Sequence, residues 1–254
     1  MKKSLLLIIL FSAFSQVAWA QPLLVFGINS HRPVAVVEAN ANQLISQLNQ
    51  YLPDYDFALR LLSPEELETA INSNELDFLI TNPMHYLQIR AQHPLTSVIA
   101  TRVRIENNQM IDRVGGVMLR LKNRTDIQTL ADLKGKSVAC LQGKFLGGFL
   151  AHINTLSQSG ISVDDLILKT LKAPHDNVVN AVLNKEVDVG FIRTGVLEDM
   201  ILEGLLQADM LEVIHPQVYD DFPYKVSTDL YPEWPVIALP KVSKRVANAV
   251  AATL

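Results

Sequence analysis

One arginine, Arg193, stands where an apolar, strand-like run, Val187–Ile192, passes into a helix-like stretch. In open α/β sheets, ligands bind at the carboxyl ends of strands, where the following helices present free N–H groups. A guanidinium at that place can grip two oxygens of an oxoanion at once. Arg193 and its neighbour Thr194 are therefore candidate anion-binding residues. The alternative is that Arg193 forms an ion pair with Glu198 or Asp199 on the following helix.

A glycine-containing segment, residues 142–148, follows another strand-like run. Glycine lets backbone N–H groups approach a ligand closely, and the start of a helix adds a partial positive charge. Gly147 and Gly148 are therefore candidate binding residues. The alternative is a loop that uses glycine only for turn geometry. The segment is not a P-loop, because it lacks the Gly-Lys-Ser/Thr ending.

Three further candidates follow predicted strands. Asn82 ends a strand and precedes a proline, and Tyr86 lies in the helix that begins there. Proline after a strand is also ordinary turn chemistry, so the position of these two residues alone suggests a role. His175 begins a predicted helix, where a capping or surface role is the alternative to a ligand contact. The candidate set consists of hydrogen-bond donors and contains no carboxylate pair.

The same sequence argues against several other classes of function. The six histidines are scattered without metal-ligand spacing, which predicts no metal and no cofactor. Cys140 is the only cysteine, and it ends a strand-like run, so we expect a buried small hydrophobic residue without a partner base. A net charge of −4 without any basic stripe predicts no nucleic-acid partner.

Helices and strands alternate along both halves of the chain, which predicts an α/β fold with two mostly parallel sheets. The stretch 96–121 differs and reads as two extended runs around a polar turn at residues 106–108. The segment 227–254 would return the chain to the first lobe. We therefore predict two lobes, one formed by residues 21–115 with 227–254 and the other by residues 116–226. The predicted strands are Leu23–Ile28, Phe57–Leu62, Phe78–Thr81, Ser137–Cys140, Leu166–Leu171 and Val187–Ile192, and the helices are Val34–Leu52, one starting after Ser63, Met84–Gln92, Phe145–Ser159, His175–Asn184 and Val196–Glu203.

The first residues, 1–20, have the features of a cleavable signal peptide. Lys2 and Lys3 are followed by a short apolar run, and Ala18 and Ala20 are small residues at the two positions that a signal peptidase reads. The apolar run is short for a membrane span, so we predict export to the periplasm, with an uncleaved anchor as the alternative.

Five motifs, taken together and in this order, resemble one family. They are "LDFLITNPMHY" (residues 76–86), "LADLKGKSVAC" (130–140), "KFLGGF" (144–149), "PHDNVVNAVLNKEVDVGFIRTGVLE" (174–198) and "STDLYPEWP" (227–235). The chain is similar to the phosphonate-type periplasmic substrate-binding proteins, which have the two-lobed type II fold with hinge strands between the lobes. Within that group, "DVGFIRTGVLE" and "LYPEWP" are most similar to the periplasmic sensor domains of tetrathionate-sensing histidine kinases.

The resemblance implies binding without catalysis, with a small oxoanion held between lobes that close around it like a hinge. It implies ligand roles for Tyr86, for the helix start at Gly147 and Gly148, and for His175, and the sensor-like motif adds Arg193 and Thr194. The implied partner is either a membrane sensor kinase or the permease of an ABC importer. If the partner is an ABC permease, the chain is expected to be the soluble binding component of an importer for phosphonate, sulfonate or a similar anion.

Two departures from the family pattern bear on these expectations. Phosphonate-binding relatives offer serine or threonine hydroxyls before the glycines, whereas residues 142–146 have none, which favours a sulfur oxoanion such as tetrathionate. Relatives also continue past this length. The last predicted helix, near Ser243, has apolar residues at helical spacing and stops without a capping glycine, so the sequence is expected to be a truncated portion of a longer protein or a standalone copy.

Overall fold

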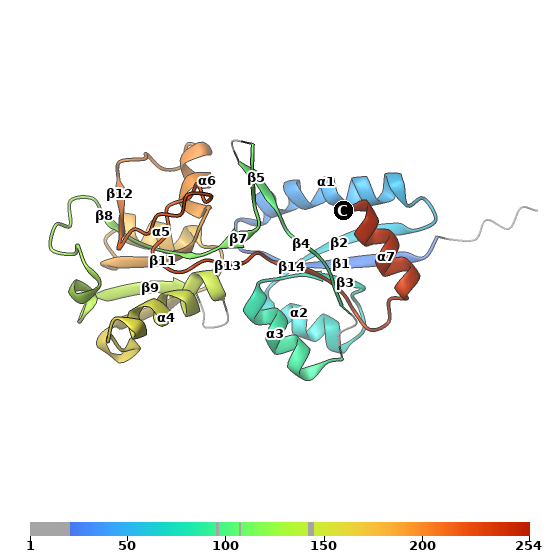
Figure 1. Cartoon of the computed structure of the whole chain (residues 1–254), viewed down its shortest axis with the longest axis horizontal. Coiled ribbons are helices and arrows are strands. Elements are labelled where there is room, and N and C mark those ends of the chain that lie inside the picture. The colour runs from blue at the N-terminus through green and yellow to red at the C-terminus, as the bar shows by residue number, and fades with distance from the viewer. Residues whose placement is uncertain (1–20, 95–96, 107, 142–144) are drawn as a thin grey trace, which may run out of the picture.

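The computed structural model describes residues 21–254 except 95–96, 107 and 142–144. These residues form two lobes side by side, and each lobe has a five-stranded sheet flanked by helices (Figure 1). This arrangement confirms the predicted two-lobed α/β architecture. The predicted signal peptide, residues 1–20, lies outside the described residues.

The sheet of lobe 1 has the strand order β2-β1-β3-β14-β4. β1 pairs in parallel with β2 and β3, whereas β14 runs antiparallel to β3 and β4. The strands are β1 (Leu23–Asn29), β2 (Asp56–Leu62), β3 (Phe78–Ile80), β4 (Ser97–Thr101) and β14 (Pro235–Ala238). The parallel pairing brings the carboxyl ends of β1 and β3 to the same edge of the sheet.

Four helices cover the two faces of this sheet: α1 (Val34–Tyr51), α2 (Pro64–Asn72), α3 (Pro83–Gln92) and α7 (Lys244–Thr253). α1 and α7 lie on one face, and α2 and α3 lie on the other (Figure 1). The buried residues of α1 recur every three or four positions, as an amphipathic helix requires. α2 begins with the predicted capping box, in which Ser63 accepts from Glu66 N–H and the Glu66 carboxylate accepts from Ser63 N–H.

The sheet of lobe 2 has the strand order β10-β9-β11-β8-β12. β10, β9 and β11 are parallel, and β8 is antiparallel to both β11 and β12. The strands are β8 (Gly116–Leu121), β9 (Ser137–Leu141), β10 (Ile167–Leu171), β11 (Val189–Arg193) and β12 (Leu211–Ile214). The helices are α4 (Ala151–Gln158), α5 (Asp176–Leu183) and α6 (Val196–Leu202), with single turns at Leu130–Leu133 and Val163–Asp165. A turn of π-helix, Leu146–Leu150, leads directly into α4.

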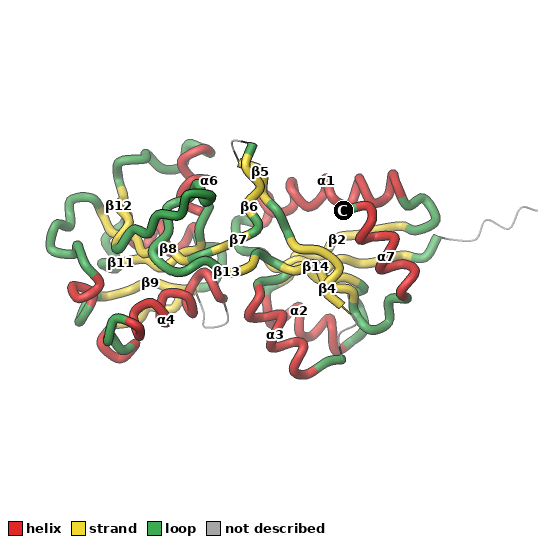
Figure 2. The backbone as a smooth tube through the Cα atoms, in the orientation of Figure 1, coloured by secondary structure: helices red, strands yellow, loops and turns green. Residues whose placement is uncertain are grey.

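Extended segments join the two lobes (Figure 2). In this region β7 (Arg113–Val114) pairs with β13 (Tyr231–Pro232), and β5 (Arg104–Glu106) and β6 (Gln109–Ile111) form a hairpin. The sheets are therefore mixed rather than mostly parallel, because the strands next to the crossings, β4, β8 and β14, run against their neighbours. β12 was missing from the predicted strands, and residues 97–121 contain five short strands rather than two extended runs. The lobe boundaries at residues 115/116 and 226/227 stay a prediction.

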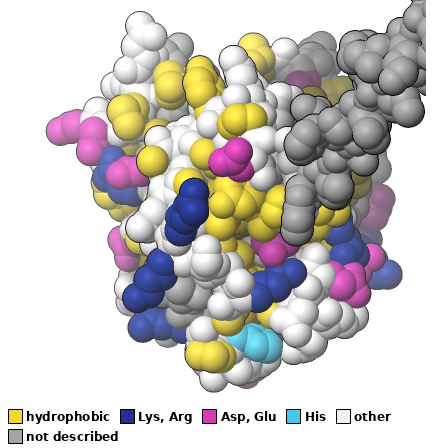
Figure 3. All heavy atoms as spheres, turned by 90° about the vertical axis from the view of Figure 1, so that its right-hand side faces the viewer, with side chains coloured by type: hydrophobic (Ala, Val, Ile, Leu, Met, Phe, Trp, Pro, Cys, Tyr) yellow, Lys and Arg dark blue, Asp and Glu magenta, His cyan; other side chains and the backbone are white. Residues whose placement is uncertain are grey.

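Cys140 is fully buried in β9, as expected, and burial raises the pKa of its thiol to about 11. Of the helices described, none combines the length and the apolar character that a membrane crossing needs. On the end of lobe 1 shown in Figure 3, Lys and Arg side chains are interspersed with acidic and apolar ones.

Candidate functional site

Arg193 is the last residue of β11, and its side chain is buried. Its Nη2 donates to Glu233 Oε1 in an ion pair, and its Nε donates to Thr194 O at 3.3 Å. Its Nη1 has no hydrogen-bond partner among the described residues. A buried guanidinium that keeps an unused donor can still bind an acceptor that enters the site.

The alternative ion pair of Arg193 with Glu198 or Asp199 is wrong. Asp199 instead pairs with Arg32 and Arg104, and Glu198 accepts from the N–H of Lys225. The physical reason is that Arg193 still belongs to the strand, so its side chain stands off the sheet instead of following the next helix.

Trp234 lies in the connection between β13 and β14, and two guanidinium groups and an imidazole surround its ring. The Arg193 guanidinium carbon is 5.3 Å from the ring centre and that of Arg102 is 6.0 Å away. The His31 ring meets Trp234 edge-on, with 4.7 Å between ring centres. The indole face attracts cations through its π electrons, so it holds both guanidinium groups without using their N–H donors.

Arg102 is half-buried, and no carboxylate of the described residues lies within 4 Å of its guanidinium. Burial lowers the pKa of Arg102 to about 10, and the neighbouring Arg193 and Arg104 act in the same direction, against the attraction of Glu233. Arg102, Arg193 and Glu233 together carry one net positive charge. The surroundings of Trp234 therefore favour an anion.

Several buried polar atoms at the strand ends lack a hydrogen-bond partner among the described residues. They are Asn29 Oδ1 and Nδ2, His31 Nδ1, Asn82 Nδ2, His175 Nδ1 and Arg193 Nη1. Asn29 ends β1 and Asn82 follows β3, which are neighbouring parallel strands of lobe 1. His175 and Arg193 belong to lobe 2, and the N–H of His175 donates to the carbonyl of His31 at 3.0 Å. The unpartnered atoms thus come from both lobes where the lobes meet, and a bound polar ligand would satisfy them.

His175 precedes α5 and is almost completely buried. Burial lowers the pKa of its imidazole well below the ordinary value, and the charge of Arg193 lowers it further. His31 behaves in the same way for the same two main reasons. Both rings are therefore neutral at pH 7, and each offers one donor and one acceptor.

Gly147 and Gly148 lie at the start of the π turn and pack against two of the other candidates. A Cβ atom on Gly147 would lie 2.8 Å from Arg193 Cβ, and one on Gly148 would lie 2.8 Å from His175 Cε1. Both positions need glycine because these side chains come so close. The first N–H groups of the turn have no intrahelical acceptor and remain candidates for an anion. The other part of the predicted glycine segment, residues 142–144, lies outside the described residues.

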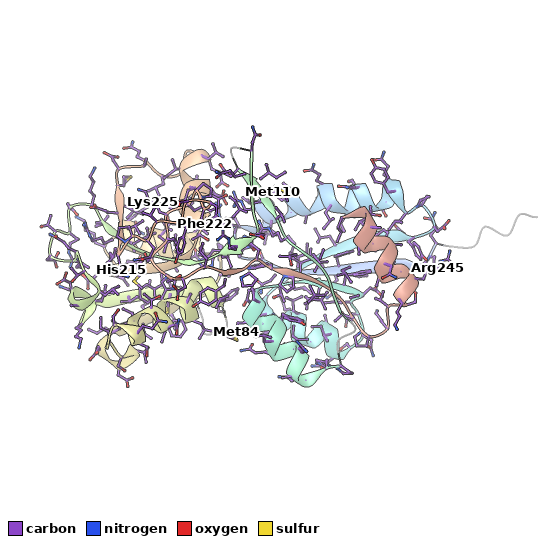
Figure 4. All side chains as sticks on the ribbon, viewed as in Figure 1. Met84, Met110, His215, Phe222, Lys225 and Arg245 are labelled. Atoms are coloured by element: carbon purple, nitrogen blue, oxygen red, sulfur yellow. The ribbon has the colours of Figure 1, made fainter. Side chains whose placement is uncertain are left out.

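The structure does not bring all predicted residues into the same contacts. Asn82 caps α3 by accepting from His85 N–H at 3.1 Å. Figure 4 shows Met84, in the first turn of α3, on the side of lobe 1 that faces lobe 2. Tyr86 is half-buried and packs against the apolar cluster under α2 and α3.

The Thr194 hydroxyl accepts from Gly115 N–H at 3.1 Å, which ties the end of β11 to the strand beside it. Ligand roles for Asn82, Tyr86 and Thr194 stay predictions.

Five residues of this cluster were missing from the predicted set: Asn29, His31, Arg102, Glu233 and Trp234. Asn29 could have been chosen, because it follows a strand as Asn82 does. Glu233 and Trp234 belong to the motif "STDLYPEWP", but nothing local shows that they reach Arg193. Among the described residues, no group of three or more His, Cys, Asp and Glu side chains could hold a metal ion.

Comparison with known proteins places the chain among known folds and sequences. Residues 26–254 match the family model described as "ABC transporter, phosphonate, periplasmic substrate-binding protein". The chain belongs to this family. Its members are substrate-binding proteins, so phosphonate-type solute binding and a periplasmic location apply to this family member as well.

This family member is similar to the tetrathionate sensor histidine kinase TtrS of Salmonella typhimurium, with 29% identity over 230 residues, which is 90% of this chain. The chain spans 38% of the length of that curated relative. Two solved structures share the fold. PhnD1 from Prochlorococcus marinus, in complex with methylphosphonate, has 17% identity and a TM-score of 0.71, covering 92% of this chain and 82% of that one. The binding protein of an ABC phosphonate transporter from Pseudomonas aeruginosa has 16% identity and a TM-score of 0.73, covering 91% and 73%.

Proposed function

We propose that this family member is an exported sensor domain that captures a small oxoanion between its lobes and signals to a two-component system. A sulfur oxoanion of the tetrathionate type is the favoured ligand. The observation that carries the proposal is the pair Arg193 and Arg102 around Trp234, with Arg193 Nη1 left without a partner. The sequence similarity to the tetrathionate sensor kinase supports the signalling role and the sulfur ligand.

The energetics of such a site are adequate for a sensor. Each hydrogen bond to a charged group contributes about 1.5–3 kcal/mol. Binding at a Kd of about 1 μM corresponds to about 8 kcal/mol. About three to five bonds of this kind reach that value before the cost of ordering the ligand and the lobes is subtracted.

Calorimetry on the domain starting at Gln21 tests the proposal, with tetrathionate, thiosulfate, sulfate, methylphosphonate and methanesulfonate as separate titrants. We expect tetrathionate to bind most tightly and the Arg193→Ala variant to bind it at least tenfold more weakly. Arg60→Ala is the matched control, because Arg60 pairs with Glu75 within lobe 1 and is exposed. Tighter binding of methylphosphonate than of tetrathionate would overturn the proposed ligand, and equal affinity of the Arg193 variant would overturn the site.

A second candidate function is the soluble binding component of an ABC importer for phosphonate, sulfonate or a similar anion. The description of the matched family model favours it. The two functions differ in their partners, so the neighbouring genes discriminate them. A permease and an ATPase indicate import, whereas a response regulator and a reductase indicate sensing.

We propose binding without turnover. A thiolate nucleophile at Cys140 is disfavoured, because the thiol is fully buried and its pKa is raised to about 11. The Nδ1 atom of His175, the other candidate for catalysis, has no hydrogen-bond partner among the described residues that could orient the ring. Tetrathionate incubated with equimolar protein should be recovered unchanged. Its loss in the wild type and its survival with His175→Ala would instead establish an enzyme.

A further inference from the structure

Arg32 links the two lobes through a network of ion pairs. It lies between β1 and α1 in lobe 1, and its side chain is 2% exposed. Its Nε and Nη2 donate to the two carboxylate oxygens of Asp176 at 3.0 and 3.2 Å. Nη2 also contacts Glu203 at 2.6 Å, and Nη1 lies 3.2 Å from Asp199. All three carboxylates belong to lobe 2, at the start of α5 and on or just after α6.

A second arginine completes this network. Arg104, on the β5–β6 hairpin, makes a two-pronged contact with Asp199 at 2.8 and 3.0 Å and lies over the ring of Tyr224. Two arginines therefore face three carboxylates across the contact. Without Arg32, three negative charges would be left close together with one positive partner. In Figure 1 the beginning of α1 faces α6, which agrees with this contact.

The ion pairs of this network do not include Arg102, Arg193 or Glu233, although Arg104 is near enough to lower the pKa of Arg102. Burial alone would lower the pKa of Arg32, but the hydrogen bonds that Arg32 donates to Asp176 and Glu203 outweigh burial and raise it. The Nε and Nη2 donors are thus used by carboxylates of the opposite lobe, whereas Nη1 lies 3.2 Å from Asp199 without a hydrogen bond among the described residues. The backbone bond from His175 N–H to His31 O lies beside it and adds a second, uncharged link.

We propose that Arg32 is an interlobe latch, a positioning residue that holds the two lobes together before any ligand binds. The contacts that carry this role are its ion pairs with Asp176, Asp199 and Glu203. A latch of this kind lowers the free-energy cost of closing the lobes. It therefore raises the binding affinity for every ligand by the same factor. A residue that touches the ligand changes the affinity for different anions by different factors.

Small-angle X-ray scattering of the ligand-free domain tests the latch without reference to any ligand. We expect Arg32→Gln to have a larger radius of gyration than the wild type. Arg124→Gln is the control, because Arg124 also pairs with two carboxylates, Asp126 and Asp188, but entirely within lobe 2. Superimposable profiles of the wild type and Arg32→Gln, or equal expansion of the control, would overturn the latch.

A second variant keeps the test decisive if Arg32→Gln does not fold. The side chain of Glu203 is 31% exposed, so Glu203→Gln removes one arm of the network with little disturbance of the core. It should expand the ligand-free domain in the same direction, by less. An unchanged radius in this variant, if it is the only one that folds, counts against the latch.

Ligand titrations separate this inference from the proposed function. In calorimetry, Arg32→Gln should weaken the binding of tetrathionate and the binding of thiosulfate by the same factor, at least fivefold. A loss confined to one anion would make Arg32 a ligand contact and overturn the latch. Failure of both anions to bind the wild type would overturn the proposed ligand class and leave the scattering result to decide the latch.

Discussion

Arg193 and Glu233 form a buried ion pair across forty residues of sequence, joining the end of β11 to the connection that returns the chain to lobe 1. Glu233 Oε2 also accepts from the backbone N–H of Trp234 at 2.9 Å. The carboxylate therefore holds both the Arg193 guanidinium and the backbone of the tryptophan whose ring the guanidinium lies against.

Removing the arginine should destabilise the fold. Breaking a buried pair by deleting one partner costs about 3–5 kcal/mol, because the remaining charge stays buried without compensation. We expect Arg193→Ala to lower the free energy of unfolding in urea by about this amount. The double variant Arg193→Met with Glu233→Gln should recover at least half of the loss. Wild-type stability of Arg193→Ala would contradict the buried pair.

Arg102 should behave in the opposite way. It has no carboxylate within 4 Å among the described residues, so Arg102→Gln leaves no buried carboxylate without its ion-pair partner. We expect its free energy of unfolding to change by less than about 1 kcal/mol, whereas the Kd for tetrathionate should rise at least tenfold, or about 1.4 kcal/mol. Arg60→Gln serves as the control in the same two measurements. Unchanged affinity would remove Arg102 from the site.

Gly148→Ala should move the ring of His175. The new Cβ would come within 2.8 Å of His175 Cε1, so the ring or the turn must shift. Overpacking of this kind costs about 1–3 kcal/mol in unfolding free energy. The matched variant is Gly148→Ala combined with His175→Ala, which makes room for the methyl group. The double variant should be less destabilised than the sum of the two single changes, and strict additivity would argue against the contact.

Stability should fall as the pH falls below 7. Burial and Arg193 depress the pKa of His31 and His175 in the folded protein. The unfolded chain takes up protons near pH 6.5, and the folded chain does not. The contribution of these histidines to the free energy of unfolding is therefore fully present above about pH 7. Toward pH 5 it declines by up to about 1.4 kcal/mol per pH unit for each such histidine. Urea titrations of His175→Gln should show a shallower decline than the wild type, with His93→Gln as control. An equal slope in His175→Gln would contradict the neutral buried imidazole.

The residues at strand ends could be predicted from the sequence, because strand and helix periodicities show where a parallel strand stops. Arg193, His175 and Asn82 were placed in this way, and all three are buried where the lobes meet or at the facing edge of lobe 1. The fold class followed from the same alternation together with the resemblance to the family.

The partners of these residues could not be predicted. Whether Arg193 meets Glu198 or Glu233 depends on how the connection near β13 and β14 crosses the molecule, and no local periodicity describes that path. Trp234 was absent from the predicted site residues for the same reason. The pairing of Arg32 with Asp176 depends on the contact between the lobes, which is a property of the assembled fold and not of either segment.

Trp234 also makes the protein its own optical probe. The sequence has two tryptophans, Trp19 and Trp234, so a chain that starts at Gln21 carries a single indole. That indole is buried, with two guanidinium groups and an imidazole around it. Its fluorescence responds to the charges around it, so an anion that draws Arg102 or Arg193 away from the ring should change the emission of the unlabelled protein in real time.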